Sequence, residues 1–96
     1  MNAPLVTEQN NRGLELAANV RKFVLESFPL ARKRQIGNSD ALIESGIVDS
    51  QGVLEVVGFI EHEYSIHVSD DDLVLDNFRS IDRIAAFIQS KTSHPA

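Results

Sequence analysis

Three stretches of the chain carry apolar residues at intervals of three and four, and this spacing constrains the fold more than any other feature of the sequence. Residues spaced in this way share one face of an α-helix, which has about 3.6 residues per turn. The stretches run from about Gly13 to Phe28, from about Ser50 to Tyr64, and onward from Ser80. In a chain of 96 residues, helices with one apolar face predict a single all-α domain around one small core.

The first predicted helix ends at Phe28, because Pro29 lacks an amide donor and favours extended backbone in the residue before it. Its buried face is expected to hold Leu16, Val20, Phe23, Val24 and Phe28. The long connection that follows, residues 29–49, is predicted to have no helix of its own and to lie folded against the core. The apolar side chains expected to make that contact are Leu42, Ile43, Ile47 and Val48.

The last third of the chain predicts two further helices. A short one is expected at about Asp72 to Asp76, since acidic residues favour a helix N-terminus, and Ser80 is the predicted N-cap of the last. The predicted fold is therefore an all-α, small four-helix bundle of three main helices and one short helix, with a long loop between the first two. Residues 1–12 and 92–96 are expected to be flexible ends of a domain that spans 13–91.

The charges are distributed unevenly along the chain. Between Arg12 and Arg34 there are six basic and two acidic residues, whereas Gln35 through Phe78 holds ten acidic residues and no Lys or Arg. Such an acidic middle repels nucleic acid and attracts basic protein surfaces, so no nucleic-acid partner is expected. No apolar run approaches the roughly 20 residues that span a bilayer, which predicts a cytoplasmic protein without membrane insertion.

Neither catalysis nor metal binding is predicted. The chain has no cysteine, and on the second helix His62 lies about 18 Å along the axis from Ser50, too far for a hydrolytic triad. Asp70, Asp71 and Asp72 do not continue as a calcium loop, because the sixth and twelfth positions from Asp70 hold Leu75 and Ile81.

Asp49 and Ser50 stand where the second helix begins. A helix N-terminus presents unpaired amides and a partial positive charge, so a phosphodiester on Ser50 would be electrostatically tolerated there. The alternative is that Ser50 is an ordinary N-cap, which contributes roughly 1 kcal/mol to the stability of the helix.

The stretch SGIVDSQGVLEVVGFIEHEYSIHVSDDDL, with NFRSIDRIAAFI after it, resembles the acyl carrier protein family, which includes peptidyl and aminoacyl carrier domains. The likeness covers about residues 13–90 and consists of an Asp-Ser pair, a glutamate five residues later, an Ile-x-Val turn and a run of acids. It is closest to stand-alone carriers that work with adenylating ligases, such as D-alanyl or other aminoacyl carriers. Gln51 stands where the family usually has leucine, and Gly58 where a fatty-acid carrier would be expected to have a bulky apolar residue.

The resemblance implies a small four-helix bundle whose Ser50 is esterified with 4′-phosphopantetheine by a holo-carrier-protein synthase, a phosphopantetheinyl transferase. Asp49 would assist by positioning the synthase's metal and coenzyme A. The thiol of the arm would hold acyl or aminoacyl groups as thioesters, so the protein would be a carrier and not an enzyme. Its further partners would be an acyl- or aminoacyl-activating ligase and downstream transferases, which a monomer would visit in turn.

The docking surface implied by the resemblance is the acidic second helix. Its candidate residues are Glu55, Glu61 and Glu63, with Val56 or Leu54 as an apolar contact near Ser50. The alternative is that these glutamates only solvate a helix face. Two other functions stay open: an unmodified acidic helical module that binds proteins, and a small metal-binding protein.

Overall fold

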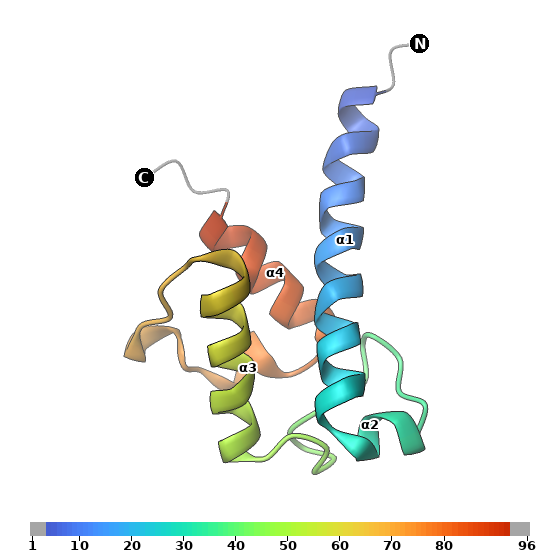
Figure 1. Cartoon of the computed structure of the whole chain (residues 1–96), viewed down its shortest axis with the longest axis vertical. Coiled ribbons are helices and arrows are strands. Elements are labelled where there is room, and N and C mark those ends of the chain that lie inside the picture. The colour runs from blue at the N-terminus through green and yellow to red at the C-terminus, as the bar shows by residue number, and fades with distance from the viewer. Residues whose placement is uncertain (1–3, 93–96) are drawn as a thin grey trace.

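The computed structural model describes residues 4–92, with side chains from Gly13 onward, and every regular element in this part of the chain is helical (Figure 1). Its α-helices are α1 (Pro4–Ser27), α2 (Pro29–Lys33), α3 (Ser50–Tyr64) and α4 (Ile81–Thr92), and its 3₁₀ turns are η1 (Asp70–Asp72) and η2 (Leu75–Phe78). The predicted all-α bundle of three main helices and one short helix is therefore confirmed.

The short helix lies in a different place from the one predicted. α2 begins at Pro29, because the fixed φ of proline suits the first position of a helix, where an amide donor is not needed. Phe28 before it is extended, with φ −123° and ψ 101°, so Pro29 both ends α1 and starts α2. The prediction that residues 29–49 contain no helix was wrong.

The prediction of a helix at about Asp72 to Asp76 was also wrong, since two separate 3₁₀ turns, η1 and η2, occupy this region. Ser69 and Asp72 form a capping box that closes after one turn, and Leu73 then leaves the helical region with φ −82° and ψ 63°. Because Ser69 caps η1 at one end and Leu73 at the other, the three residues between them are too few for an α-helix to propagate.

The N-terminal end of the domain differs from the prediction. α1 begins at Pro4 instead of Gly13, and its first turns extend beyond the other helices (Figure 1). Proline is favoured at this first helical position. The N-terminal segment 1–12 predicted to be flexible thus overlaps α1, and residues 1–3 lie outside the described residues. Of the predicted tail 92–96, only Thr92 is described, as the last residue of α4.

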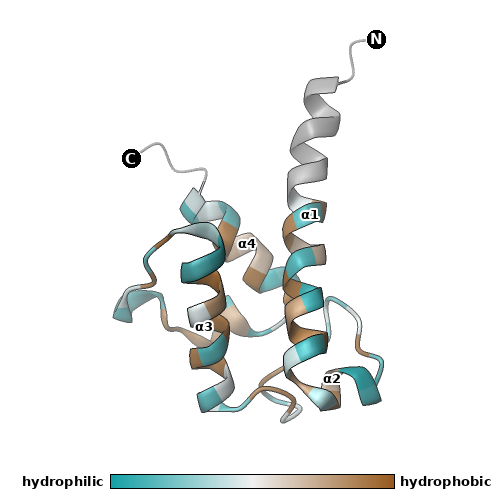
Figure 2. Ribbon diagram, in the orientation of Figure 1, coloured by the Kyte–Doolittle hydropathy of each residue, from teal (hydrophilic) through white to brown (hydrophobic). Residues whose placement is uncertain are grey.

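The core lies where α1, α3 and α4 face one another, and Figure 2 shows hydrophobic residues on those sides of the helices. Its fully buried members include Val20, Val24, Leu42, Val56, Ile60, Ile81, Ile84 and Ile88. At the edge of the core, the rings of Phe23 and Phe59 stack with centroids 4.3 Å apart and join α1 to α3. The predicted buried face of the first helix is confirmed, except that Phe23 is only partly buried.

The loop between α2 and α3 is folded against this core, as predicted. Leu42, Ile47 and Val48 are buried, whereas Ile43 is partly exposed. The backbone is fixed by hydrogen bonds to the end of η2 and the start of α4: the amide of Leu42 donates to the carbonyl of Arg79 at 2.8 Å. The start of α3 is therefore held by packing on its N-terminal side.

Candidate functional site at the start of α3

Asp49, not Ser50, caps α3. Asp49 is extended, with φ −94° and ψ −174°, and its Oδ1 accepts a hydrogen bond from the amide of Gly52 at 2.8 Å. A cap residue of this kind satisfies one of the amides that have no partner within the helix. The interpretation of Ser50 as the N-cap was wrong, because the helix begins one residue earlier than that role requires.

Ser50 is consequently the first helical residue, and its side chain is exposed. Within the described part of the chain, its hydroxyl makes no hydrogen bond, since the capping position is filled by Asp49. The hydroxyl stands at the positive end of the helix dipole, where a phosphate group would be stabilised. The serine is thus free to be modified without the loss of a cap.

Gly52 fixes the backbone around this serine. A Cβ built on Gly52 would lie 2.8 Å from Cε1 of Phe28 and 3.0 Å from Cγ1 of Val48, both closer than ordinary contact. The residue between α1 and α2 and the loop before α3 therefore pack directly on the first turn of α3. This role was not predicted, although a glycine in the first turn of an apolar helix was the available signal.

An open, mostly apolar groove with a volume of about 300 Å³ lies beside Ser50. We call it the Ser50 groove; its other lining residues are Ile43, Val53, Leu54, Leu73, Val74, Leu75 and Phe78. Leu54 is 61% exposed and Val74 48% exposed, and with exposed Leu73 and Leu75 they form one apolar patch along the groove. The groove could not be predicted from the sequence, because the exposure of Leu73, Val74 and Leu75 depends on the 3₁₀ turns η1 and η2.

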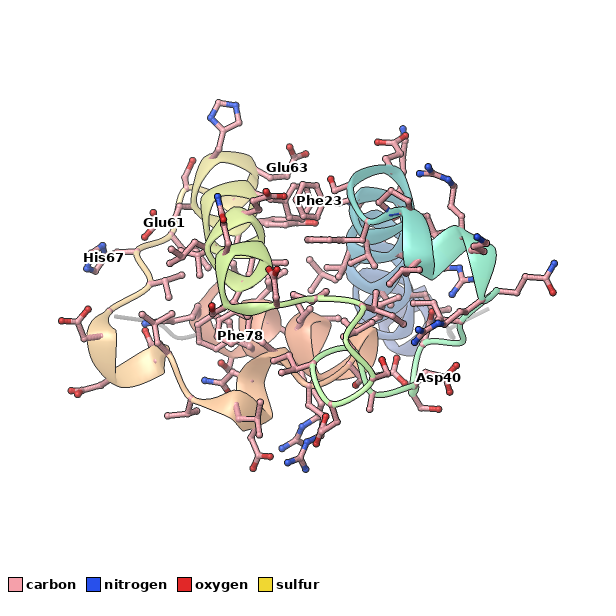
Figure 3. The ribbon with its side chains drawn as sticks, turned by 90° about the horizontal axis from the view of Figure 1, so that it is seen from below. Phe23, Asp40, Glu61, Glu63, His67 and Phe78 are labelled. Carbon is pink, nitrogen blue, oxygen red and sulfur yellow. The ribbon has the colours of Figure 1, made fainter. Side chains whose placement is uncertain are left out.

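The three candidate glutamates do not form one surface. Glu55 is exposed and lines a polar hollow together with Asp49 and Gln51, close to the serine. Glu63 is exposed on the side of α3 that faces α1, beside Phe23 (Figure 3). Glu61 lies on the opposite side of the helix, because successive residues turn by about 100°.

Glu61 has a structural role that the sequence did not reveal. Its Oε2 accepts a hydrogen bond from the amide of Val68 at 2.9 Å and lies 3.7 Å from Nδ1 of His67. It thereby ties the chain after α3 back to the helix. Its side chain is 38% exposed and is only partly available to a partner.

Val56 is not available for docking, and its assignment to the docking surface was wrong. It is 1% exposed, because it lies one helical turn before Ile60 on the face of α3 that points into the core. Leu54, two residues earlier, points to solvent at the edge of the Ser50 groove. Of the two apolar candidates, only Leu54 can touch a partner.

The arginines of α2 and of the residue after it are engaged with backbone carbonyls. Arg32 donates to the carbonyls of Leu25 and Glu26, and Arg34 donates to that of Ser45 at 2.9 Å. These bonds hold α2 and the following loop to α1. The start of α3, in contrast, is surrounded by the exposed side chains of Asp49, Gln51 and Glu55.

No protein-family model matches the chain, and no curated protein matches it. Among the residues described, no cluster of three or more His, Cys, Asp or Glu is placed to hold a metal ion. Within the same residues, no helix combines the length and the apolar character needed to cross a membrane.

Proposed function

We propose that this protein is a carrier that tethers acyl or aminoacyl groups as thioesters on a 4′-phosphopantetheine arm attached to Ser50. The observation that carries the proposal is the hydroxyl of Ser50: exposed, without a hydrogen bond to any described residue, and one position inside a helix that Asp49 caps. The likeness to the acyl carrier protein family gives this hydroxyl its proposed use. When bound, the arm supplies the thiol that the chain itself lacks.

The surroundings of Ser50 fit such an arm. Attachment would form a bond between the serine oxygen and the β-phosphorus of coenzyme A and release adenosine 3′,5′-bisphosphate, with the serine proton passing to a base of the transferase. The new phosphodiester would lie at the positive end of α3. Asp49 is exposed and uses Oδ1 for the cap, and we propose that it also orients the transferase's metal and coenzyme A.

The Ser50 groove gives the arm an apolar surface to lie against. None of its lining side chains is charged, so it suits the apolar part of an acyl or aminoacyl group and leaves a charged group in solvent. The groove is open, so a bound group stays within reach of partner enzymes. A flexible arm raises the effective concentration of its cargo at each of these enzymes.

Partner enzymes would dock on a smaller surface than the whole acidic helix. We propose that it is centred on Leu54 and Glu55, which are both exposed and close to Ser50. Glu63 is a second charged contact on the α1 side, and Glu61 contributes only in part because of its bond to Val68. The partners would be a holo-synthase, an activating ligase and downstream transferases with basic surfaces.

The test is the mass of the protein after incubation with a phosphopantetheinyl transferase and coenzyme A. We expect one phosphopantetheine on the native chain and none on Ser50→Ala, which keeps the Asp49 cap and should therefore fold normally. Asp49→Asn retains a capping side chain and is expected to be modified more slowly. An unchanged mass of the native chain with several transferases would contradict the carrier proposal.

The exposed leucine and valine side chains around the groove favour one alternative, an unmodified module that binds proteins through this apolar surface. The two functions differ in their dependence on the hydroxyl. Ser50→Ala abolishes carrier function but leaves an apolar docking surface intact, so a binding partner that does not distinguish the two proteins would support the module.

A further inference from the structure

One side of the Ser50 groove is formed by a segment that contributes nothing to the buried core. Residues 69–77, which we call the groove wall, lie between buried Val68 and buried Phe78, and none of them is itself buried. The wall comprises η1 and most of η2, and its Leu73, Val74 and Leu75 line the groove. A segment with so little buried apolar surface opens locally at low cost compared with the core helices.

Hydrogen bonds within the wall keep its own shape. Oδ2 of Asp72 accepts from both the amide and the hydroxyl of Ser69 at 3.0 Å, and the side-chain amide of Asn77 donates to the carbonyl of Asp72 at 2.8 Å. Asp72 is therefore the residue around which the wall is organised. These bonds join wall residues to one another, so they do not hold the wall to the bundle.

The wall is tied to α4 by two ion pairs of unequal quality. Nζ of Lys91 lies 2.7 Å from Oδ2 of Asp72, and the two side chains are only 31% and 22% exposed. Arg83 lies 3.8 Å from the carboxylate of Asp76 and donates from Nε to the carbonyl of Asp76 at 3.3 Å, with side chains that are 55% and 58% exposed. Since exposed pairs contribute little, the Lys91–Asp72 pair is the stronger tie.

Lys91 is itself held in place by a second contact, with the ring of Phe87 in α4. Its Nζ lies 5.9 Å from the centroid of the Phe87 ring, whose own neighbour is Phe78, at 5.7 Å between centroids. Phe78 is the buried residue at which the wall ends. The lysine thus links the middle of the wall to the same aromatic pair that fixes its end.

We infer that the groove wall opens locally between Val68 and Phe78, with loss of its internal hydrogen bonds, and that Lys91 is the positioning residue that holds it closed through Asp72. Leu73 and Val74 follow Asp72 directly, so release of this pair moves the lining of the groove and changes its width. The wall and its ion pair belong to the unmodified chain, so this opening does not depend on modification of Ser50. Its consequence for a tethered group, which is control over how the group enters the groove, rests on the proposed function.

The test is amide hydrogen exchange, measured residue by residue by NMR on the native chain and on Lys91→Met, which removes the charge and keeps the helix-forming side chain. The amides of Leu73 and Val74 donate to the carbonyls of Asp70 and Asp72, so their exchange reports opening of the wall. We expect these amides to be less protected than the amide of buried Val24 in α1, and to exchange about three- to fivefold faster in Lys91→Met than in the native chain.

Matched variants separate the ion pair from other causes. Lys91→Arg keeps the charge and is expected to restore most of the protection of Leu73, whereas Arg83→Met, at the weaker tie, is expected to change it less than Lys91→Met does. Ser50→Ala should behave as the native chain, so this test is independent of whether the serine is ever modified.

Four results would overturn the inference. They are unprotected wall amides in the native chain, wall amides as strongly protected as that of Val24, which would indicate that the wall opens only when the whole domain unfolds, unchanged exchange at Leu73 and Val74 in Lys91→Met, and failure of Lys91→Arg to differ from Lys91→Met.

Discussion

The two glycines of α3 provide a direct test of how its first turn is packed. Gly52→Ala places a methyl group 2.8 Å from Phe28 and 3.0 Å from Val48, and neither neighbour can move freely, because they are 8% and 2% exposed. Gly58→Ala makes the same chemical change six residues later, where nothing lies within 4 Å of the added atom. The pair therefore isolates the close approach of Phe28 and Val48 to α3.

The expected effects have opposite signs. Overpacking a core contact costs about 1–3 kcal/mol, and replacing a helical glycine by alanine returns up to about 1 kcal/mol. Gly52→Ala should therefore lower the free energy of unfolding by about 1–2 kcal/mol. Gly58→Ala should raise it by up to about 1 kcal/mol, since only the helix-propensity gain applies.

Urea unfolding followed by the helical circular dichroism signal measures both free energies. A change of 1 kcal/mol corresponds to about 4–8 °C in Tm for a domain of this size, so thermal unfolding would detect it as well. If Gly52→Ala is as stable as the native chain, or if both variants shift in the same direction, the argument that Gly52 is needed for the approach of Phe28 is incorrect.

Three further outcomes are expected. Hydrogen bonding to Lys91 lowers the pKa of Asp72 from 3.8 to about 2. The stability that this carboxylate contributes is therefore present above about pH 4 and is lost as the pH falls toward 2. Carbon-detected NMR titration of Asp72 should show this low midpoint, and the midpoint should rise in Lys91→Met. Ser65→Gly should stabilise the protein by up to about 1 kcal/mol in urea unfolding, because Ser65 ends α3 with φ 55°. Glu55→Lys should weaken binding to a cognate ligase in calorimetry more than Glu63→Lys does, and added salt should weaken the native complex; salt-independent binding would argue against electrostatic docking.

The positions of α3 and α4 and the end of α1 could be predicted because each of these helices buries one face. Apolar spacing located α3 and α4 to within a residue or two, and Ser80 accepts from the amide of Arg83 at 3.1 Å, as its predicted capping role requires. The short elements could not be located in this way. Pro29 was interpreted only as the end of a helix, whereas the same fixed φ also starts α2.

The details of the candidate site required tertiary structure. Asp49 and Ser50 are both good capping residues, and the choice between them depends on where the chain turns from extended to helical, which is set by the packing of Gly52 on Phe28. The burial of Val56 depends on which side of α3 faces the core. The apolar residues of α3 cover too wide a part of its surface for the sequence to define that side. The Ser50 groove depends on contacts between segments far apart in the chain.

The separation of charge described above makes the molecule an electric dipole. Arg32 and Lys33 of α2 and Arg34 after it lie on one side of the molecule, whereas Asp70 and Asp71 of the groove wall lie on the other side (Figure 1). An approaching cationic surface would therefore exert a torque that turns the groove wall toward it before the two proteins touch. This alignment would act within about 10 Å at 0.1 M salt, so it would speed encounters while leaving dissociation to short-range contacts.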